Sequence, residues 1–339
     1  MSGDPSQRLA LLLSGFALRM WGARIQAAVP DCQLDFVDAE EAFRANAPCA
    51  AGIAFMTREV TGNSTSNNQT RELREFEAVL RNTPGLRWLQ IHPAGAERQI
   101  YRELRARRVK VTTGSGATAV TVGHSTLGAV IALNRRFPLL ADAQRRHAWE
   151  PCWGERAPRD LKGQCAVIVG LGPVGRNIAA LLKVLGMGVI GVRRNPGPVE
   201  PCDETTVYGR LLKVLPRADW LILCCPASPL TQGLVDAAAL AAMPAGALLV
   251  NVARGEVVVE RDLIAALASG KLGGAYLDVF EKEPLDPASP LWDMHNVLIS
   301  PHTAGHSQGQ QEAVLEIFLD NLRRWCAGDK LRNDADDLR

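Results

Sequence analysis

Short runs of apolar residues, separated by longer stretches of mixed polarity, recur along most of the chain. In the first third of the chain these runs have the length and composition of strands, and helical spacing lies between them. This alternation predicts a small α/β unit. Its expected strands cover residues 9–14, 34–37, 51–55, 88–91 and 109–112.

The pattern changes near residue 113. A mainly apolar stretch over 117–137 is too long for a strand and rich in good helix formers, so it predicts a buried helix that bridges two parts of the chain. The segment 144–162 has no periodicity and contains Trp149 and Trp153. It predicts an irregular connection that is packed by its tryptophans.

A second α/β unit follows this connection, and its predicted strands are apolar throughout. Wholly apolar strands that alternate with helices are typical of a parallel, doubly wound sheet with helices on both faces. The expected strands are 165–169, 189–192, 220–224, 247–251, 274–277 and 297–299, with helices from Gly175 and near 209–215, 236–242 and 260–269.

The last part of the chain, 308–327, has helical spacing and no strand of its own. We expect it to return to the first unit, which makes that unit discontinuous. The chain is therefore divided into one domain of residues 1–113 plus 307–339 and a second domain of residues 114–306. A chain of 339 residues is long enough for two such cores.

Composition narrows the classes of partner. The 38 basic and 36 acidic residues are intermixed and leave a net charge of +2, which favours a small metabolite over nucleic acid. The eight cysteines lack the spacing of a zinc site or a disulfide scaffold, so we predict no metal site. Apolar runs fall short of the roughly 18–20 residues that span a bilayer, and no cleavable signal is recognisable. We expect a soluble, cytoplasmic protein without a membrane partner.

A glycine-rich turn, Gly170-Leu-Gly-Pro-Val-Gly175, directly follows the strand 165–169 and opens a helix. Gly170 allows a tight turn, Gly172 lets a pyrophosphate approach the backbone, and Gly175 lets the helix pack closely on the strand. A purely structural turn is the alternative, but the strand-turn-helix context favours dinucleotide binding. The candidate cofactor-binding residues here are Gly170, Gly172, Pro173, Val174 and Gly175.

Arg193 and Arg194 follow the next strand, where an NAD-specific enzyme usually has Asp or Glu. Two guanidinium groups can pair with a 2′-phosphate, and no carboxylate repels it. The sequence therefore favours NADP(H) over NAD(H). The alternative is a solvated basic turn.

Polar residues that suit hydride-transfer chemistry occur just after successive predicted strands: Arg254, Asp278 and His302, with Glu283 in a nearby loop. Ligands of open parallel sheets bind at this edge. Arg254 can bind a substrate carboxylate, His302 can exchange a proton with the carbonyl oxygen, and Glu283 can orient the imidazole and stabilise its charged form. Reduction should therefore slow as rising pH removes the imidazolium proton. Taken singly, each residue would more often be a surface or ion-paired group.

These motifs resemble those of the D-isomer-specific 2-hydroxyacid dehydrogenases, in particular glyoxylate/hydroxypyruvate reductases. The resemblance implies an α/β fold in which a Rossmann-type domain is inserted into a smaller flavodoxin-like substrate domain, usually in a homodimer. It also implies a catalytic set of Arg254, Glu283 and His302, with Asp278 beside the nicotinamide. The motifs that carry it are 170–175, 251–255, 277–280, 281–284 and 301–305. Pro226, Thr231 and Ala253 are further candidate cofactor contacts.

The same resemblance suggests substrate contacts in the first domain. The backbone at Pro93, Ala94 and Gly95 could bind the substrate carboxylate, and Met56 to Arg58 could line the pocket. Arg58 could meet a second acidic group or simply face solvent. The polar loop Thr61 to Thr70 could act as a lid.

Two departures from the family leave the substrate open. Val122-Gly123-His124 replaces the common Val-Ala-Glu, so that His124 could face the cleft in which the family has its active site. Gly95-Ala96-Glu97 replaces Gly-Val-Asp. A small 2-oxo or 2-hydroxy acid such as glyoxylate or hydroxypyruvate is favoured over phosphoglycerate, since no appended regulatory domain is recognised.

Two alternatives to this activity remain. One is a nucleotide-sensing corepressor-like binding protein, and the other is a dehydrogenase of amino or phosphorus-containing acids. Retention of Arg254, Glu283 and His302 favours catalysis.

Overall fold

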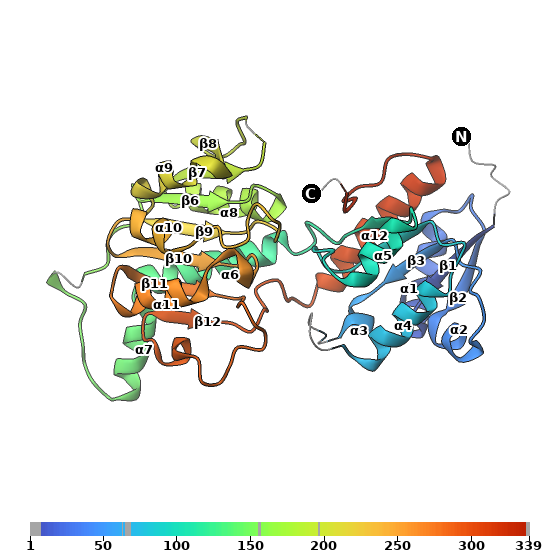
Figure 1. The fold of residues 1–339 in the computed structure, drawn as a ribbon, viewed down its shortest axis with the longest axis horizontal. Helices are drawn as coiled ribbons and strands as arrows, with labels where there is room; N and C mark the ends of the chain where they lie inside the picture. Colours follow the sequence, from blue (N-terminus) through green and yellow to red (C-terminus); the bar gives the residue numbers. More distant parts are fainter. Residues whose placement is uncertain (1–7, 63, 65–68, 155–156, 196, 337–339) are drawn as a thin grey trace. The chain divides into compact units, whose positions relative to one another are not determined.

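The computed structural model describes residues 8–62, 64, 69–154, 157–195 and 197–336, which form two compact units (Figure 1). Unit 1 joins the N-terminal part of the chain, up to Ala117, to the C-terminal part from Gln308, and unit 2 comprises Thr118–Ser307. The division falls after residues 117 and 307, against the expected boundaries after residues 113 and 306. Unit 2 is thus inserted in the sequence of unit 1.

Unit 1 contains a parallel sheet in the order β2-β1-β3-β4-β5 among the described residues. This is the strand order of flavodoxin-like folds, in which the chain reverses direction across the sheet beside the first strand. The strands are β1 (Leu9–Leu13), β2 (Leu34–Asp38), β3 (Ile53–Met56), β4 (Trp88–Ile91) and β5 (Lys110–Thr112).

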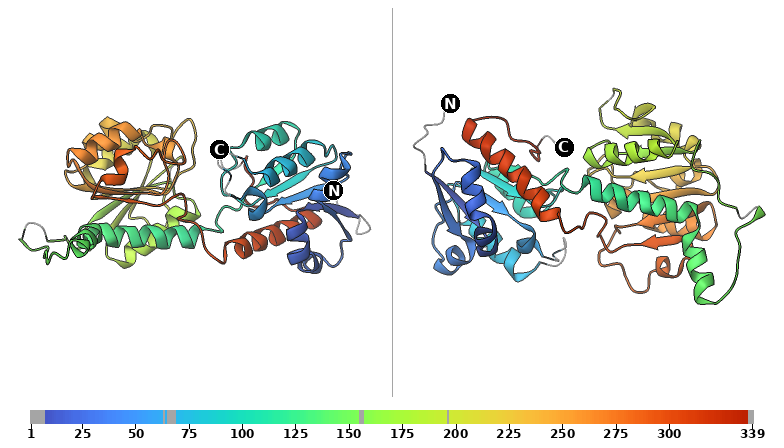
Figure 2. Two further views of the ribbon diagram at one scale, coloured as in Figure 1. Left: turned by 90° about the horizontal axis from the view of Figure 1, so that it is seen from below. Right: turned by 180° about the vertical axis from the view of Figure 1, so that it is seen from behind.

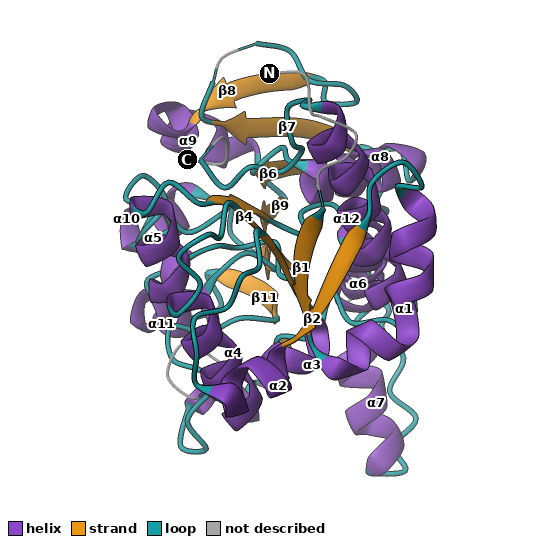
Figure 3. Ribbon diagram, turned by 90° about the vertical axis from the view of Figure 1, so that its right-hand side faces the viewer, coloured by secondary structure: helices purple, strands orange, loops and turns teal. Residues whose placement is uncertain are grey.

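Helices cover both faces of this sheet. α1 (Gly15–Ala28) and the C-terminal α12 (Gln310–Ala327) lie on one face, and α4 (Arg71–Arg81) and α5 (Gln99–Ala106) lie on the other (Figure 3). The short helices α2 (Ala39–Ala45) and α3 (Arg58–Thr61) join the second group.

Phe318 anchors α12 by stacking on Phe55 of β3, with the ring centroids 4.3 Å apart. Both side chains are fully buried, so removing this area from water stabilises the docked helix. The last helix therefore packs in the core of unit 1, as its apolar spacing predicts.

Unit 2 contains a parallel sheet in the order β12-β11-β10-β9-β6-β7-β8 among the described residues. Six of these strands follow the Rossmann order, and β12 extends the sheet at one edge. Their bounds are β6 (Cys165–Val169), β7 (Gly188–Arg193), β8 (Glu204–Val207), β9 (Trp220–Leu223), β10 (Ala247–Asn251), β11 (Leu272–Leu277) and β12 (Val297–Ile299).

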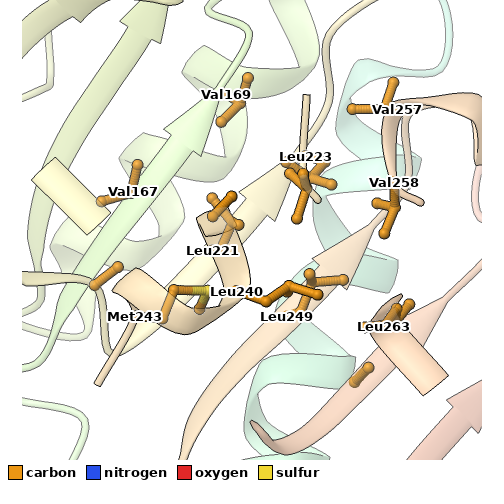
Figure 4. Packing of buried hydrophobic residues seen from close by; sticks show 14 of the residues in the cluster. Val167, Val169, Leu221, Leu223, Leu240, Met243, Leu249, Val257, Val258 and Leu263 are labelled. Atoms are coloured by element: carbon orange, nitrogen blue, oxygen red, sulfur yellow. The ribbon is translucent and has the colours of Figure 1, made fainter. Parts of the chain in front are cut away.

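The core of unit 2 lies on both faces of its sheet. α6 (Ala119–Asn134) and α8 (Pro173–Val184) cover one face. α9 (Leu211–Val214), α10 (Ala237–Ala242) and α11 (Glu260–Ala268) cover the other, where branched aliphatic side chains interdigitate (Figure 4). The 3₁₀ turns are η2 (Tyr208–Arg210), η3 (Leu215–Arg217), η4 (Gly255–Val257) and η5 (Pro290–Asp293).

Three sequence expectations need correction. β8 was not predicted, because this edge strand reads Glu-Thr-Thr-Val and none of its residues is buried. The single helix expected over 117–137 is divided: α6 ends at Asn134, and α7 (Phe137–Arg145) begins after Arg136, which has φ +57°. Pro138 thereby falls in the first turn of α7, where a missing N–H is tolerated.

The third correction concerns the connection after α7. Trp149 and Trp153 were expected to pack it, but their exposed fractions are 93% and 79%.

Among the described residues, every helix is too short or too polar to span a lipid bilayer.

Candidate active site

The glycine-rich turn between β6 and α8 has the geometry of a phosphate cradle. Gly170 has φ +102°, and a Cβ there would lie 2.7 Å from the Cα of Cys225. A Cβ at Gly175 would lie 1.9 Å from the carbonyl oxygen of Gly170, so the helix packs directly on the turn. Gly172 faces open space, since a Cβ there would meet nothing within 4 Å.

The N-terminus of α8 is well suited to an anion. Its N-cap, Gly172, has no side chain to bind the first N–H groups, and Pro173 follows as the first helical residue. The N–H groups of Val174 and Gly175 therefore lie at the positive end of the helix dipole. A dinucleotide pyrophosphate fits these residues.

Arg193 ends β7 and Arg194 follows it, beside the glycine turn, where Gly170 N–H donates to the oxygen of Val192 at 2.8 Å. Arg193 is partly buried and Arg194 is exposed, and neither forms an ion pair with another described residue. Burial raises the pKa of the nearby Tyr208 hydroxyl to about 12, which the two guanidinium charges oppose. Both arginines are therefore available to an external anion.

Thr231 shapes the loop that follows β9. Its side chain is buried, and its hydroxyl donates to the carbonyl oxygen of Pro226 at 2.8 Å and accepts from Ser228 N–H at 2.9 Å. These bonds hold the exposed Pro226 ring at the carboxyl end of the strand. Thr231 therefore acts indirectly, by holding the loop that contains Pro226.

Arg254 is positioned by a buried asparagine that was not among the predicted site residues. Asn251 Oδ1 accepts from Ala253 N–H at 3.1 Å, and Asn251 Nδ2 donates to the oxygen of Arg254 at 3.2 Å. Gly255 then lies directly on the next loop, because a Cβ there would be 1.9 Å from the carbonyl carbon of Phe280. The motif Asn-Val-Ala-Arg-Gly is the sequence signal for this arrangement.

Asp278 holds the loop that carries His302. Its buried Oδ1 accepts from Ser300 Oγ at 2.5 Å, from Thr303 N–H at 2.8 Å and from Ala304 N–H at 3.0 Å. Ser300 was not predicted, since a single serine after a strand carries no distinctive signal. Asp278 was predicted to lie beside the nicotinamide. In the structure its Oδ1 instead accepts hydrogen bonds from the loop that carries His302.

His302 has φ +55°, a conformation that few non-glycine residues adopt. Its N–H donates to the oxygen of Asp278 at 2.8 Å, and its Nδ1 lies 2.8 Å from Glu283 Oε2. The ring is half exposed, whereas the side chain of Glu283 is 24% exposed. A carboxylate on Nδ1 leaves Nε2 as the nitrogen that can exchange a proton with a ligand.

The charge of Arg254 also acts on the Glu283 carboxylate. Burial acts to raise the pKa of Glu283, but the hydrogen bond and charge of His302, the Phe280 N–H and the charge of Arg254 together lower it below its ordinary value. Phe280 N–H donates to Glu283 Oε1 at 3.3 Å. The three residues follow β10, β11 and β12, which are neighbours in the sheet.

The predicted substrate contacts belong to unit 1. Pro93, Ala94 and Gly95 follow β4 and are at least partly exposed. Met56 requires a correction: it is fully buried in the core, where its Sδ accepts from the Tyr101 hydroxyl at 3.5 Å, so it does not line a pocket. Arg58 Nη1 donates to the oxygen of Gly62 at 2.6 Å.

Two further expectations concern the surroundings of the site. His124 is exposed on α6 of unit 2. The suggested lid, Thr61 to Thr70, includes positions 63 and 65–68, which lie outside the described residues. In the described part of the chain no cluster of His, Cys, Asp or Glu could hold a metal ion.

A Rossmann-type sheet with a glycine-rich turn, together with a His–Glu pair at its carboxyl edge, is the arrangement of nicotinamide-dependent oxidoreductases. A model of one protein family matches this chain. Residues 127–304 match the family model described as "D-isomer specific 2-hydroxyacid dehydrogenase, NAD binding domain", which covers more than half of the chain. The chain belongs to the D-isomer-specific 2-hydroxyacid dehydrogenase family, and it is an NAD(P)-dependent oxidoreductase acting on hydroxy acids.

Named relatives and solved structures agree with this family. The chain is 34% identical to (S)-sulfolactate dehydrogenase of Chromohalobacter salexigens over 264 residues, covering 76% of this chain and 82% of that protein. It is 30% identical to glyoxylate reductase of Korarchaeum cryptofilum over 259 residues, covering 75% and 76%. A crystal structure of a family member from Xanthobacter autotrophicus Py2, in complex with NADPH and MES, is 28% identical with a TM-score of 0.75, covering 98% of this chain and 99% of that chain.

Proposed function

We propose that this protein is a D-2-hydroxyacid dehydrogenase that works as a 2-oxo acid reductase, with Arg254, Glu283 and His302 as its catalytic set. The observation that carries the proposal is the 2.8 Å contact between His302 Nδ1 and Glu283 Oε2, with the charge of Arg254 acting on the same carboxylate. A histidine ring held in this way is oriented for proton exchange through Nε2.

Each residue then has a distinct task. Arg254 binds the substrate carboxylate and polarises the adjacent carbonyl group. His302 Nε2 donates a proton to the carbonyl oxygen during reduction and accepts it during oxidation. Glu283 holds the ring and stabilises its charged form. Bound nicotinamide supplies or accepts the hydride.

We assign cofactor binding to unit 2 and favour NADP(H) over NAD(H). Gly170, Gly172, Pro173, Val174 and Gly175 form the pyrophosphate cradle. Arg193 and Arg194 have no ion-pair partner in the described chain and so can bind a 2′-phosphate. Pro226, Ala253 and Asp278, which follow the carboxyl ends of three strands, are the further cofactor contacts that we propose. The NADPH bound to the Xanthobacter relative supports this choice.

We assign substrate recognition to unit 1 through the loop Pro93 to Gly95. The substrate is a small 2-oxo acid: glyoxylate and hydroxypyruvate are the first candidates. The name of the Chromohalobacter relative adds 3-sulfopyruvate, whose reduction yields sulfolactate. Arg58 could meet the second anionic group of such a substrate.

A substrate panel tests the proposal. Purified protein is mixed with NADPH or NADH and with glyoxylate, hydroxypyruvate, 3-sulfopyruvate, pyruvate, phenylpyruvate or 2-oxoglutarate, and oxidation of the cofactor is followed by absorbance. Turnover with NADPH supports the assignment, and turnover with NADH alone overturns the role of the arginines. Binding of cofactor without turnover of any acid favours the corepressor-like alternative, and turnover of imino acids favours another acid class.

We also propose that the protein is a cytoplasmic homodimer. Four large apolar side chains are exposed on α7 and the connection after it, an unusual density for a monomer's surface: Phe137, Leu140, Trp149 and Trp153. A second copy of the chain would bury them. Light scattering should give twice the mass of the chain for the wild type and a smaller mass for the variant Trp149→Ala/Trp153→Ala. Trp292→Ala, which removes a 50% exposed tryptophan of the same unit, is the control.

A further inference from the structure

The chain leaves unit 1 through a short exit segment, residues 113–117, between the end of β5 at Thr112 and the boundary after Ala117. Residues 331–336, which follow α12, turn back toward this exit segment (Figure 2). There Asp334 forms an antiparallel bridge with Thr112. Two parts of the chain that are 220 residues apart in sequence therefore meet inside unit 1.

Asn333 makes the direct contact with the exit segment. Its Nδ2 donates to the oxygen of Ser115 at 2.7 Å and to the oxygen of Thr113 at 3.3 Å, and its own carbonyl oxygen accepts from Thr113 N–H at 3.0 Å. Both partners of the side chain are carbonyl oxygens, so the NH₂ group of the amide must face them. The backbone of Asn333 has φ +58°, a conformation that asparagine adopts more readily than most residues.

The two carbonyl groups held by Asn333 lie on either side of Gly114, which touches the loop after β4. Gly114 N–H donates to the oxygen of Pro93 at 3.0 Å. A Cβ at Gly114 would lie 2.1 Å from the oxygen of His92, so the two backbones are in direct contact. With no side chain between them, a displacement of residues 113–115 is passed to Pro93.

Other contacts dock residues 331–336 without the side chain of Asn333. Lys110 Nζ lies 3.2 Å from Asp334 Oδ2, and this pair reinforces the backbone bridge to β5. Arg105 Nη1 of α5 lies 3.3 Å from Asp336 Oδ1. Removal of the asparagine amide should therefore free the exit segment while the rest of the returning chain stays in place.

We propose that Asn333 is a positioning residue for substrate binding, because it holds the peptide groups on both sides of Gly114 and thereby fixes the loop Pro93 to Gly95. This inference rests on the proposed function, which assigns recognition of the substrate carboxylate to that loop. Backbone N–H groups bind a carboxylate well only when their directions are fixed in advance. Asn333 acts within unit 1, so its effect should fall on the acid and not on the cofactor, which the proposed function assigns to unit 2.

The test compares the full-length wild type with Asn333→Gly. Glycine adopts φ +58° without strain, so this variant loses the two side-chain hydrogen bonds but keeps the backbone conformation. With NADPH and the best acid of the substrate panel, we expect the KM for the acid to rise about tenfold and the KM for NADPH to stay unchanged. A general loosening of the fold would not produce this split.

Hydrogen exchange followed by mass spectrometry gives a readout that is independent of activity. In Asn333→Gly, peptides that cover residues 113–117 and 93–97 should exchange at least about threefold faster than in the wild type, because their amides lose a fixed partner or neighbour. Lys110→Ala is the matched control. It removes the ion pair to Asp334 in the same returning segment and leaves the bonds of Asn333 intact, so it should change neither exchange at these peptides nor either KM.

Several results would overturn the inference. Unchanged exchange at both peptides in Asn333→Gly would show that the amide does not hold the exit segment, whether or not the protein is active. Faster exchange with an unchanged KM for the acid would show that the loop does not depend on this contact for binding. Equal rises in the KM for acid and for NADPH, or the same changes in Lys110→Ala, would indicate a non-specific loss of structure. A wild type that binds NADPH but turns over no acid would instead remove the proposed function.

Discussion

Glu283→Gln is the substitution that most directly tests the proposed chemistry. Glu283 accepts two hydrogen bonds through different oxygens, from Phe280 N–H at 3.3 Å and from the ring of His302 at 2.8 Å. A glutamine has one oxygen and one NH₂ group, so in either orientation one of these donors faces another donor. The variant keeps the shape of the side chain but loses the charge and one of the two bonds.

The size of the effect follows from this geometry. A hydrogen bond to a charged group contributes about 1.5–3 kcal/mol. The histidine ring is half exposed, and solvent screening places the loss at the lower end of that range. Since about 1.4 kcal/mol corresponds to a factor of ten, we expect kcat/KM for reduction to fall about tenfold at neutral pH.

The assay is oxidation of NADPH across a range of pH, with the best acid of the substrate panel. Glu281→Gln is the matched control, because this exposed acid lies two residues earlier and its side chain accepts from Glu260 N–H, at the N-terminus of α11. An unchanged kcat/KM in Glu283→Gln, or an equal loss in Glu281→Gln, would refute the reasoning. If Glu283→Gln instead raised the KM for the cofactor and left kcat unchanged, the substitution would have moved the loop that carries residue 283.

Three further predictions concern stability and cofactor choice. Because the folded pKa of Glu283 lies below its ordinary value, its carboxylate stabilises the protein above the unfolded pKa, and this contribution is lost as pH falls through the folded pKa. Urea titrations should therefore show Glu283→Gln less stable than wild type at about pH 7 and nearly equal at about pH 3. Arg193→Ser/Arg194→Ser should raise the KM for NADPH at least about tenfold and leave that for NADH unchanged, since only the former carries a 2′-phosphate; equal effects on both cofactors would contradict the assignment. Gly255→Ala should lower the melting temperature by the equivalent of about 1–3 kcal/mol, since its Cβ would lie 1.9 Å from backbone, whereas Gly128→Ala, in open space on α6, should be neutral or stabilising.

The elements that could be predicted are those in which local pattern and burial agree. β6 and β10 have the expected bounds, because apolar runs flanked by turn residues are buried as central strands. β12 also has the expected bounds, although it lies at the edge of the sheet and is only partly buried. The edge strand β8 could not be predicted in the same way. Its polar residues pair with β7 through backbone hydrogen bonds, and these are independent of side-chain polarity.

The candidate site was predictable to a similar degree. Arg254, Glu283 and His302 follow three successive strands, and parallel strands bring their carboxyl ends to one edge of a sheet. The bracing residues were not predictable, since Asn251 and Ser300 act through backbone atoms of their neighbours. Met56 was misplaced because a residue at the end of a strand points to the core or to a pocket with no difference in sequence pattern.

The sequence by itself determined the doubly wound α/β class, the glycine-rich turn and the residue types of the proposed catalytic set, because strand periodicity and glycine positions depend on local chemistry. Only the tertiary structure decided which side chains meet. The 2.8 Å contact of His302 with Glu283 and the anchoring of the loop by Asp278 both join separate elements. Such contacts depend on how helices and strands pack, and packing is set by the shape of the whole core rather than by any local run of residues.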